Sequence, residues 1–109
     1  MTEPVIGEFE QLVLFAVASL EPDGYGAAIR QLIEERTGRD ASAGAIYTTL
    51  ERLEARGLVA STWGAPTPER GGKRKRHYRL KPAGREALAR SWQAVKAMAR
   101  GVTPRLEQP

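Results

Sequence analysis

One short segment, from Glu69 to Lys81, carries seven of the chain's seventeen Lys and Arg residues and only one acidic residue. In its second half Arg76, Tyr78 and Leu80 fall on one side, and the cationic or polar residues between them fall on the other. That alternation is typical of a β-strand. Such a concentration of positive charge creates a field that a polyanion would feel.

The alternating segment Leu58–Trp63 precedes this strand, and a polar loop containing Pro and Gly lies between them. The two segments therefore predict a β-hairpin with a long tip. Apolar periodicity predicts four helices around the hairpin. Their ranges are Glu8–Leu20, about Tyr25–Arg36, Ala43–Arg56 and about Ala83–Arg100.

Residues at the expected helix ends support these boundaries. Ser42 suits the N-cap of the third helix, Gly38 and Gly57 suit the ends of the second and third, and Pro82 suits the first turn of the last. The second and third helices are joined by a short connection, as in a helix-turn-helix. The predicted fold class is mainly α with a small β-hairpin: a winged helix-turn-helix with an added C-terminal dimerisation helix.

A chain of 109 residues is sufficient for one core. We expect the winged helix-turn-helix over residues 8–81, the dimerisation helix over 82–100 and a flexible tail over 101–109. The absence of cysteine excludes disulfides and thiolate metal sites, and a single histidine makes a zinc site unexpected, so no metal or cofactor is predicted. No apolar run reaches transmembrane length and no signal peptide is evident, which predicts a cytoplasmic protein.

In a helix-turn-helix the second helix of the pair enters the major groove of DNA and presents its outward face to base edges. Small residues near the start of this helix allow close approach to phosphates, and Thr49 is also expected to face outward. The candidate DNA-binding residues are Ser42, Gly44, Tyr47, Thr48 and Arg52 on the helix, and Arg70, Lys73, Arg74, Lys75 and Arg76 on the hairpin. Tyr47 has two interpretations, hydrogen bonding to phosphate or packing alone.

The first helix is apolar nearly all round, so we expect a second chain to cover one of its sides. The last helix has an apolar stripe that suits the same contact. The candidate dimer residues are Phe9, Leu12, Phe15, Leu88, Trp92, Val95 and Ala99. A homodimer predicts an inverted-repeat operator in double-stranded DNA. Trp92 has two interpretations, interface packing, which we favour, or stacking of a small aromatic effector.

Four groups of residues resemble the PadR family of bacterial transcriptional regulators. They are Gly24-Tyr25-Gly26; Ser42-x-Gly44-x-Ile46-Tyr47; Leu50-x-Arg52-Leu53-Glu54 with Gly57-Leu58-Val59; and Arg76-x-Tyr78-x-Leu80 before Ala83-Gly84. The resemblance spans about Phe9 to Leu88. It implies a dimeric winged-helix DNA-binding protein, usually a repressor, from the compact branch with a single short C-terminal helix.

Two positions depart from the family pattern. Thr48 stands where the family often has proline, and Lys81-Pro82 replaces the usual Thr-Glu before the last helix. The first departure bears on contacts to bases, and the second bears on where the last helix begins. Neither departure affects the expected fold.

Other function classes fit the sequence less well. An enzyme needs a convergent set of titratable groups, and the sequence shows no nucleophile with a base, no phosphate loop and no metal-ligand spacing. An RNA-binding protein is disfavoured because the A-form major groove is too narrow to admit a helix. The alternative that stays open is a winged-helix protein-interaction module without DNA binding, although such a module does not need the basic hairpin.

Overall fold

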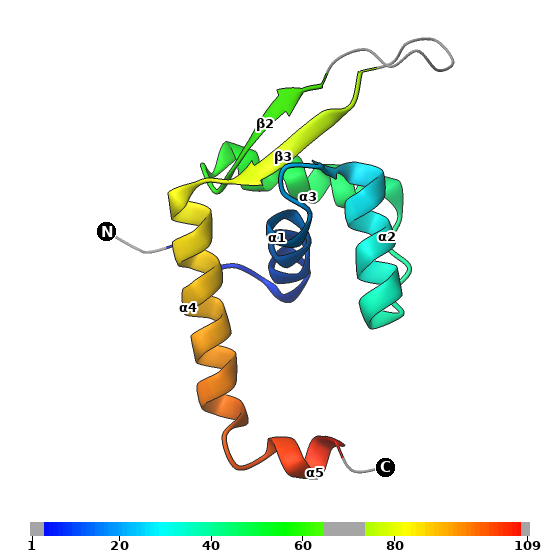
Figure 1. Cartoon of the computed structure of the whole chain (residues 1–109). Coiled ribbons are helices and arrows are strands. Elements are labelled where there is room, and N and C mark those ends of the chain that lie inside the picture. The colour runs from blue at the N-terminus through cyan, green and yellow to red at the C-terminus, as the bar shows by residue number, and fades with distance from the viewer. Residues whose placement is uncertain (1–3, 65–73, 108–109) are drawn as a thin grey trace.

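Helix α1 (Glu8–Leu20) lies at the centre of the molecule, and the next three helices and the first and third strands all pack against it (Figure 1). Its side chains Val13, Leu14 and Val17 are completely buried. Because one helix supplies the middle of the core, its sequence needs apolar residues on more than one side. The core of the subunit therefore accounts for the buried side of α1, whereas Phe15 stays 38% exposed.

The computed structural model describes residues 4–64 and 74–107, and it has the predicted helices and strands in the predicted order, with one short strand and one short C-terminal helix added. The remaining helices are α2 (Gly26–Thr37), α3 (Ala43–Ala55), α4 (Pro82–Ala99) and α5 (Thr103–Glu107), and the strands are β1 (Gly24–Tyr25), β2 (Val59–Trp63) and β3 (Arg76–Leu80). The predicted winged helix-turn-helix is therefore confirmed. Within the described residues, no helix is long and apolar enough to cross a membrane.

The core is formed by apolar residues from α1, α2, α3 and the sheet. The largest fully buried side chains outside α1 are Ile29, Ile46, Leu50, Leu53, Leu58 and Val59. Those from α3 occur at positions 46, 50 and 53, so one face of α3 is committed to the core and the opposite face stays exposed. Thr49 also lies on the buried side, with 6% of its surface exposed, so the expectation that it faces outward was wrong.

The ends of α2 and α3 follow the predicted residues. Gly38 and Gly57, with φ of 73° and 76°, adopt the left-handed conformation that glycine tolerates best, and each follows the last turn of its helix. At the start of α3 the Ser42 hydroxyl accepts a hydrogen bond from the Ala45 amide at 3.0 Å. The cap fixes where the helix begins and satisfies one of its free N–H groups.

The sheet has three antiparallel strands in the order β1-β3-β2. Strands β2 and β3 form the predicted hairpin, with Val59 opposite Leu80 and Trp63 opposite Arg76. The short strand β1 pairs with the other edge of β3; it was not predicted, and Tyr25 was expected to begin the second helix. At Gly24 an added Cβ would lie 2.8 Å from the Tyr78 carbonyl oxygen, so the third strand requires glycine there.

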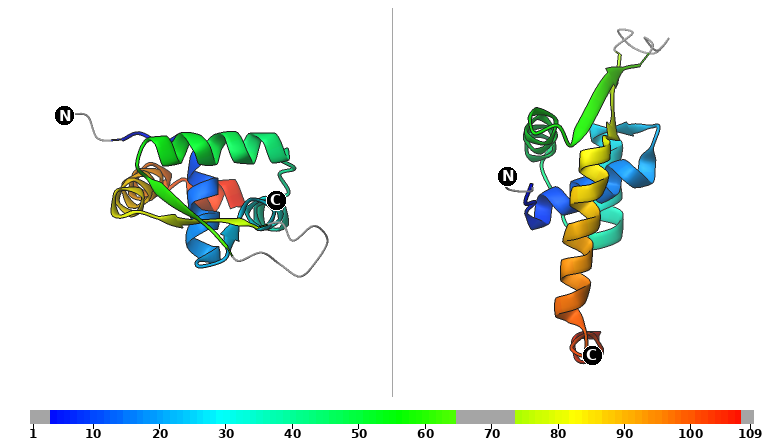
Figure 2. Two further views of the ribbon diagram at one scale, coloured as in Figure 1. Left: turned by 90° about the horizontal axis from the view of Figure 1, so that it is seen from above. Right: turned by 90° about the vertical axis from the view of Figure 1, so that its left-hand side faces the viewer.

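Helix α4 starts on the body and then extends away from it (Figures 1 and 2). Its first turns pack closely because Gly84 lies directly against the backbone of Leu58. Leu88, which was expected at a dimer surface, is only 7% exposed and belongs to the core of its own subunit. That assignment was wrong, because the stripe of α4 faces the body over its first turns and becomes exposed only farther along.

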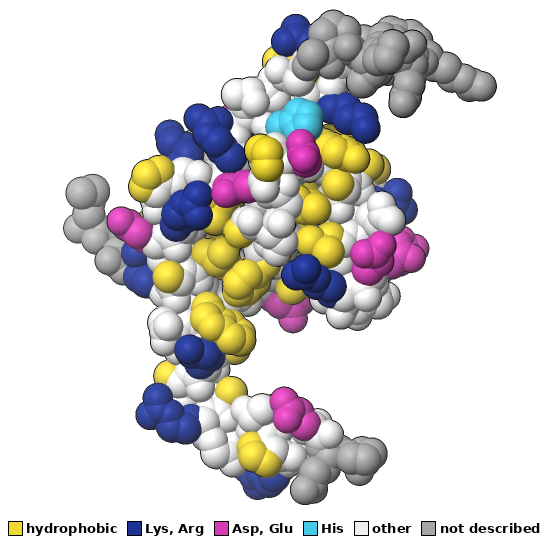
Figure 3. Space-filling view, in the orientation of Figure 1, with side chains coloured by type: hydrophobic (Ala, Val, Ile, Leu, Met, Phe, Trp, Pro, Cys, Tyr) yellow, Lys and Arg dark blue, Asp and Glu magenta, His cyan; other side chains and the backbone are white. Residues whose placement is uncertain are grey.

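Beyond α4 the chain turns at Gly101, where φ is 80°, and forms the short helix α5. Residues 103–107 of the segment expected to be a flexible tail thus form a helical turn. We refer to the outer turns of α4 together with α5, residues 92–107, as the C-terminal arm. Figure 3 shows an open notch between this arm and the body.

Replacing Gly84 by alanine tests the close contact between α4 and the hairpin. An added Cβ would lie 2.0 Å from the Leu58 carbonyl oxygen, so the backbone must shift. We expect Gly84→Ala to lower the free energy of unfolding by about 2 kcal/mol or more in urea denaturation. The control is Gly44→Ala in α3, where the nearest atom is 3.9 Å away. It should be neutral or stabilising by up to about 1 kcal/mol, and equal losses from both variants would contradict the packing.

Candidate nucleic-acid interface

One face of α3 is exposed along its whole length. Gly44, Thr48 and Arg52 are spaced by four residues on this face, opposite the buried residues Ile46 and Leu53. Small side chains surround the capped first turn, where the N–H groups and the positive end of the helix dipole face solvent. The face therefore offers a partner backbone N–H groups at the start of α3 and side chains farther along the helix.

Arg52 is the long cation of this face. The structure gives its side chain no hydrogen bond or ion pair with any residue in 4–64 or 74–107. Most other arginines of the body are engaged: Arg30, Arg39, Arg56, Arg76 and Arg85 each pair with a carboxylate. A cation that stays exposed on a helix face is available to a partner outside the chain.

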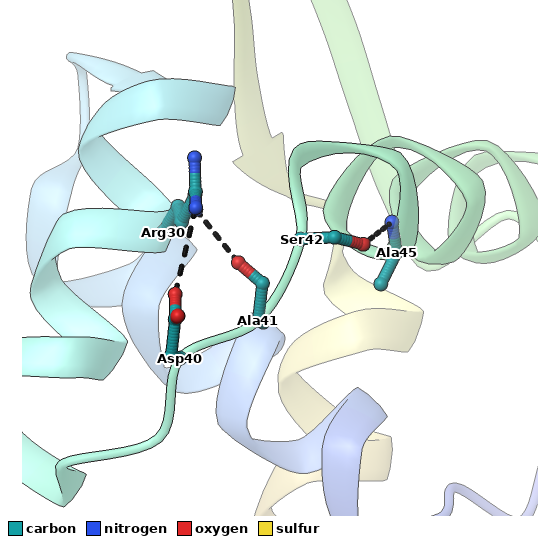
Figure 4. A network of polar contacts seen from close by, with 5 residues as sticks. All are labelled: Arg30, Asp40, Ala41, Ser42 and Ala45. Carbon is teal, nitrogen blue, oxygen red and sulfur yellow. Dashed lines mark hydrogen bonds and ion pairs between the residues drawn. The ribbon is translucent and has the colours of Figure 1, made fainter.

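The turn before α3 is held by Arg30 of α2 (Figure 4). Its Nε donates to the Ala41 carbonyl oxygen at 2.6 Å, and its Nη2 lies 3.5 Å from the Asp40 carboxylate. The bond to Ala41 is the stronger of the two, since the Asp40 pair is long and exposed. This contact fixes the angle between α2 and α3, and therefore the direction in which α3 presents its first turn.

Tyr47 packs beside the first residue of α2. An added Cβ at Gly26 would lie 2.7 Å from the ring and the hydroxyl of Tyr47, so Gly26 provides the space that the ring occupies. The side chain is nevertheless 46% exposed, and it lines a hollow of about 340 Å³ between α2 and α3 together with Arg30 and Ala43. The two interpretations of Tyr47 are compatible, because its ring packs against Gly26 while part of the side chain stays exposed where α2 and α3 begin.

The inner face of the hairpin is tied to α3 by Glu54, Ser61 and Arg76. The Glu54 carboxylate accepts from the Ser61 hydroxyl at 2.7 Å and from Arg76 Nη2 at 2.9 Å, while Arg76 Nε donates to the Ser61 oxygen at 2.8 Å. The guanidinium also lies between two aromatic rings, 5.6 Å from the Trp63 centroid and 5.7 Å from that of Tyr78. We call the three polar residues the wing clamp.

Arg76 was expected to bind phosphate, and the structure gives it a different role. Its side chain points toward the body and all its recorded contacts are with the clamp and the neighbouring rings. Helix periodicity alone could not assign Glu54 to this contact, because its partners lie on two strands and Arg76 is 22 residues away. Burial beneath the clamp raises the pKa of Tyr78 above 10.0, although Arg76 opposes this shift.

The cations Arg74 and Lys75 lie just before β3, and each contacts a neighbouring group. The Lys75 ammonium lies 4.2 Å from the Tyr25 ring centroid, and His77 meets the same ring edge-on at 5.7 Å. Arg74 donates from Nε to the Gly64 carbonyl oxygen at 2.9 Å, which closes the base of the loop. These contacts position Arg74 and Lys75 without neutralising them. The predicted site residues Arg70 and Lys73 lie outside the described residues.

The other predicted dimer residues belong to α1 and α4. The rings of Phe15 and Trp92, which are 38% and 44% exposed, meet edge-on at 6.0 Å. Val95 is 47% exposed, and Phe9, Leu12 and Ala99 are half-buried. The structure thus brings Phe15 and Trp92 together within one subunit and leaves an apolar surface around them.

The wing clamp can be tested with a double-mutant cycle between Glu54→Gln and Arg76→Met. Because both side chains are partly buried, we expect a coupling energy of roughly 1 kcal/mol in urea denaturation. The matched control is the exposed pair Glu8 and Arg39, which are 79% and 46% exposed and should couple by much less. Additive effects of the Glu54 and Arg76 substitutions would show that the hairpin is held in some other way.

Comparison with known proteins identifies the family to which this arrangement belongs. A family model described as the transcriptional regulator PadR-like family matches residues 14–90. The transcriptional regulator Rv3488 of Mycobacterium tuberculosis is 40% identical over 78 residues, which are 72% of this chain and 68% of that protein. A 37.1 kDa protein of transposon TN4556 of Streptomyces fradiae is 42% identical over 81 residues, 74% of this chain, but the match spans only 21% of that protein.

Solved structures show the same fold. A PadR family transcriptional regulator from Eggerthella lenta has a TM-score of 0.67 and 27% identity, covering 94% of this chain and 88% of that one. A PadR-like transcriptional regulator from Bacillus cereus has a TM-score of 0.72 at 21% identity, with 93% of each chain covered, which is a likeness of fold alone. Family membership makes this protein a regulator and not an enzyme, as expected. The chain belongs to the PadR-like family of transcriptional regulators.

Proposed function

We propose that this regulator binds an inverted-repeat operator in double-stranded DNA as a homodimer and represses transcription from it. Helix α3 lies in the major groove, and the cations of the hairpin contact the flanking phosphates. The observation that carries the proposal is the exposed face of α3, with its capped start and the unengaged Arg52, beside a hairpin clamped to the same helix. Binding to DNA would make the cytoplasm its place of action.

The arrangement of the molecule supports this proposal. Helix α3 and the hairpin lie at one end, and α5 lies at the other (Figure 1). Ser42 keeps its hydroxyl proton available for a phosphate oxygen while its oxygen caps α3, so the two roles predicted for it are compatible. Thr48, one turn farther along the exposed face, is placed to meet a base edge or a thymine methyl group.

Charge on the outer surface favours DNA over a protein partner. Arg52, Arg74 and Lys75 are exposed on α3 or the hairpin, and none of them pairs with a carboxylate of the described residues. A winged-helix module that binds another protein has no need for cations arranged in this way. The alternative of a protein-interaction module is therefore the less favoured function.

The proposed dimer uses the apolar surface of α1 and the C-terminal arm. Phe15 and Trp92 are large apolar side chains that meet each other and stay partly uncovered, and Val95 is exposed about one turn farther along α4. Trp92 already has Phe15 against its ring and the Lys96 ammonium 5.8 Å from its centroid. We therefore assign Trp92 to dimer packing rather than to binding of an aromatic effector. Its ring already has an aromatic and a cationic neighbour, and aromatic residues are common in protein interfaces.

Arg52→Ala tests the placement of α3 in the groove. Each good bidentate contact to a base contributes about 1–3 kcal/mol of discrimination, so we expect affinity for the operator to fall at least about tenfold, with a smaller loss on unrelated DNA. Fluorescence anisotropy with a duplex from the gene's own upstream region measures both. Arg105→Ala, which removes an exposed cation from α5, is the control and should leave affinity within about twofold.

The same titration gives the dependence on salt. Two to four phosphate contacts per subunit predict a slope of log K against log salt of roughly −4 to −7 for the dimer. A slope near zero, or equal losses for Arg52→Ala and Arg105→Ala, would contradict DNA binding through α3 and the hairpin.

Val95→Asp tests the dimer surface without disturbing the core, because Val95 is already 47% exposed. A buried carboxylate in an apolar interface is strongly unfavourable, so we expect the dissociation constant of the dimer to rise at least about tenfold. Analytical ultracentrifugation across a concentration series measures this change. Gln93→Asp places the same charge at an exposed neighbouring position of α4 and should have little effect. A dimer unaffected by Val95→Asp would mean that this surface is not the interface.

A further inference from the structure

The end of the C-terminal arm carries apolar side chains that none of the residues in 4–64 and 74–107 covers. Met98 is 82% exposed and Leu106 is 74% exposed, and none of the described residues of α5 is buried. Helix α5 has five residues and shares at most marginal contact with any other element. A helix this short is not stable in water by itself, so we expect it to need a surface on which to pack. Both residues lie beyond the segment matched by the family model.

A small apolar slot on the body is a candidate site for one of these side chains. It lies between α1 and α2 and has a volume of about 70 Å³. Its apolar lining consists of Leu12, Phe15, Ala16, Leu32 and Ile33, and Arg36 and Thr37 complete it. Sites for drug-sized ligands have volumes of about 300–1,000 Å³, so this slot is too small for one. Its size and lining suit a single apolar side chain.

We propose that the slot receives Leu106 of α5 from a second copy of the chain. This inference rests on the proposed homodimer and names a contact that completes it. Helix α4 has 18 residues and is therefore about 27 Å long, which carries α5 away from the slot of its own subunit (Figures 1 and 3). A two-fold axis at the notch places each arm against the body of the other subunit, so both slots are filled in the same way.

Charge supports the same pairing. Arg36 borders the slot, and its one recorded contact is a long hydrogen bond of 3.4 Å to the Ser19 hydroxyl. Glu107, the acidic residue of α5, follows Leu106 directly and is exposed. With Leu106 in the slot, its carboxylate lies within reach of the partner's Arg36 guanidinium. The slot also borders the proposed dimer surface, because Phe15 lines it and contacts Trp92 of α4.

Disulfide cross-linking tests this contact directly, because the chain has no cysteine. The variant carries Leu106→Cys together with Leu32→Cys, a partly buried position that lines the slot. Under mild oxidation we expect a covalent dimer on a non-reducing gel, which each single variant should not form. The control pairs Leu32→Cys with Arg85→Cys at the start of α4, which should also give no covalent dimer.

The outcomes separate this inference from the proposed dimer. A protein that is dimeric by light scattering but forms no cross-link, or only one within a single chain, would overturn the docking of α5 and leave the dimer intact. A monomeric protein would overturn both.

Substitutions give an independent measurement. Leu106→Asp should weaken the dimer at least about tenfold, since a buried leucine side chain contributes about 1.5–3 kcal/mol. Arg36→Glu should weaken it less, and Arg36→Glu combined with Glu107→Arg should recover most of that loss. Dissociation constants that are unchanged by Leu106→Asp would contradict the proposal.

Discussion

Buried apolar residues anchor the base of the hairpin, and farther out a partly buried polar contact, in which Arg76 joins Glu54 and Ser61, holds it against α3. A two-stranded hairpin is barely stable alone, and the outer part of this one extends beyond the core. The clamp, the flanking aromatic rings and the third strand β1 compensate for this lack of apolar support. Because Glu54 belongs to α3, any displacement of the hairpin must also disturb the helix that is proposed to enter the groove.

Contacts around glycine set the remaining geometry of the proposed interface. Gly26 makes room for the Tyr47 ring at the start of α2, and Gly84 allows α4 to reach the end of α3. At the far end of α3, Arg56 donates to Glu10 of α1 at 3.1 Å and to the Val5 carbonyl oxygen at 2.7 Å. Helix α3 is thus fixed at its start by Arg30 and at its C-terminal end by Glu54 of the clamp and by Arg56. Its exposed face is presented by a rigid support, as recognition requires.

Features governed by local chemistry could be predicted from the sequence. The Ser42 cap, the left-handed glycines at positions 38 and 57 and the alternation of β3 all depend on neighbours in the chain, and the structure has each of them. Features governed by distant contacts could not be predicted. Strand β1 exists because β3 offers it an edge, and Leu88 is buried because the body covers the first turns of α4.

The same distinction applies to the candidate site. The exposed face of α3 follows from helical periodicity, whereas the role of Arg76 depends on Glu54, which lies 22 residues away. The alternation of β3 places Arg76 on the same side as Tyr78 and Leu80, and that side faces the core. A cation on the inward side of a strand needs a partner. The position of Arg76 in the alternation therefore indicated a contact of this kind, which the composition of the segment does not show.

Hydrogen–deuterium exchange of the protein with and without its operator duplex tests most directly whether α3 and the hairpin form the DNA-binding surface. The account predicts slower amide exchange at residues 43–52 and 74–77 in the complex, with α5 unchanged by DNA at protein concentrations where the free protein is already dimeric. Protection confined to α1 and α4, with residues 43–52 exchanging as in the free protein, would contradict it.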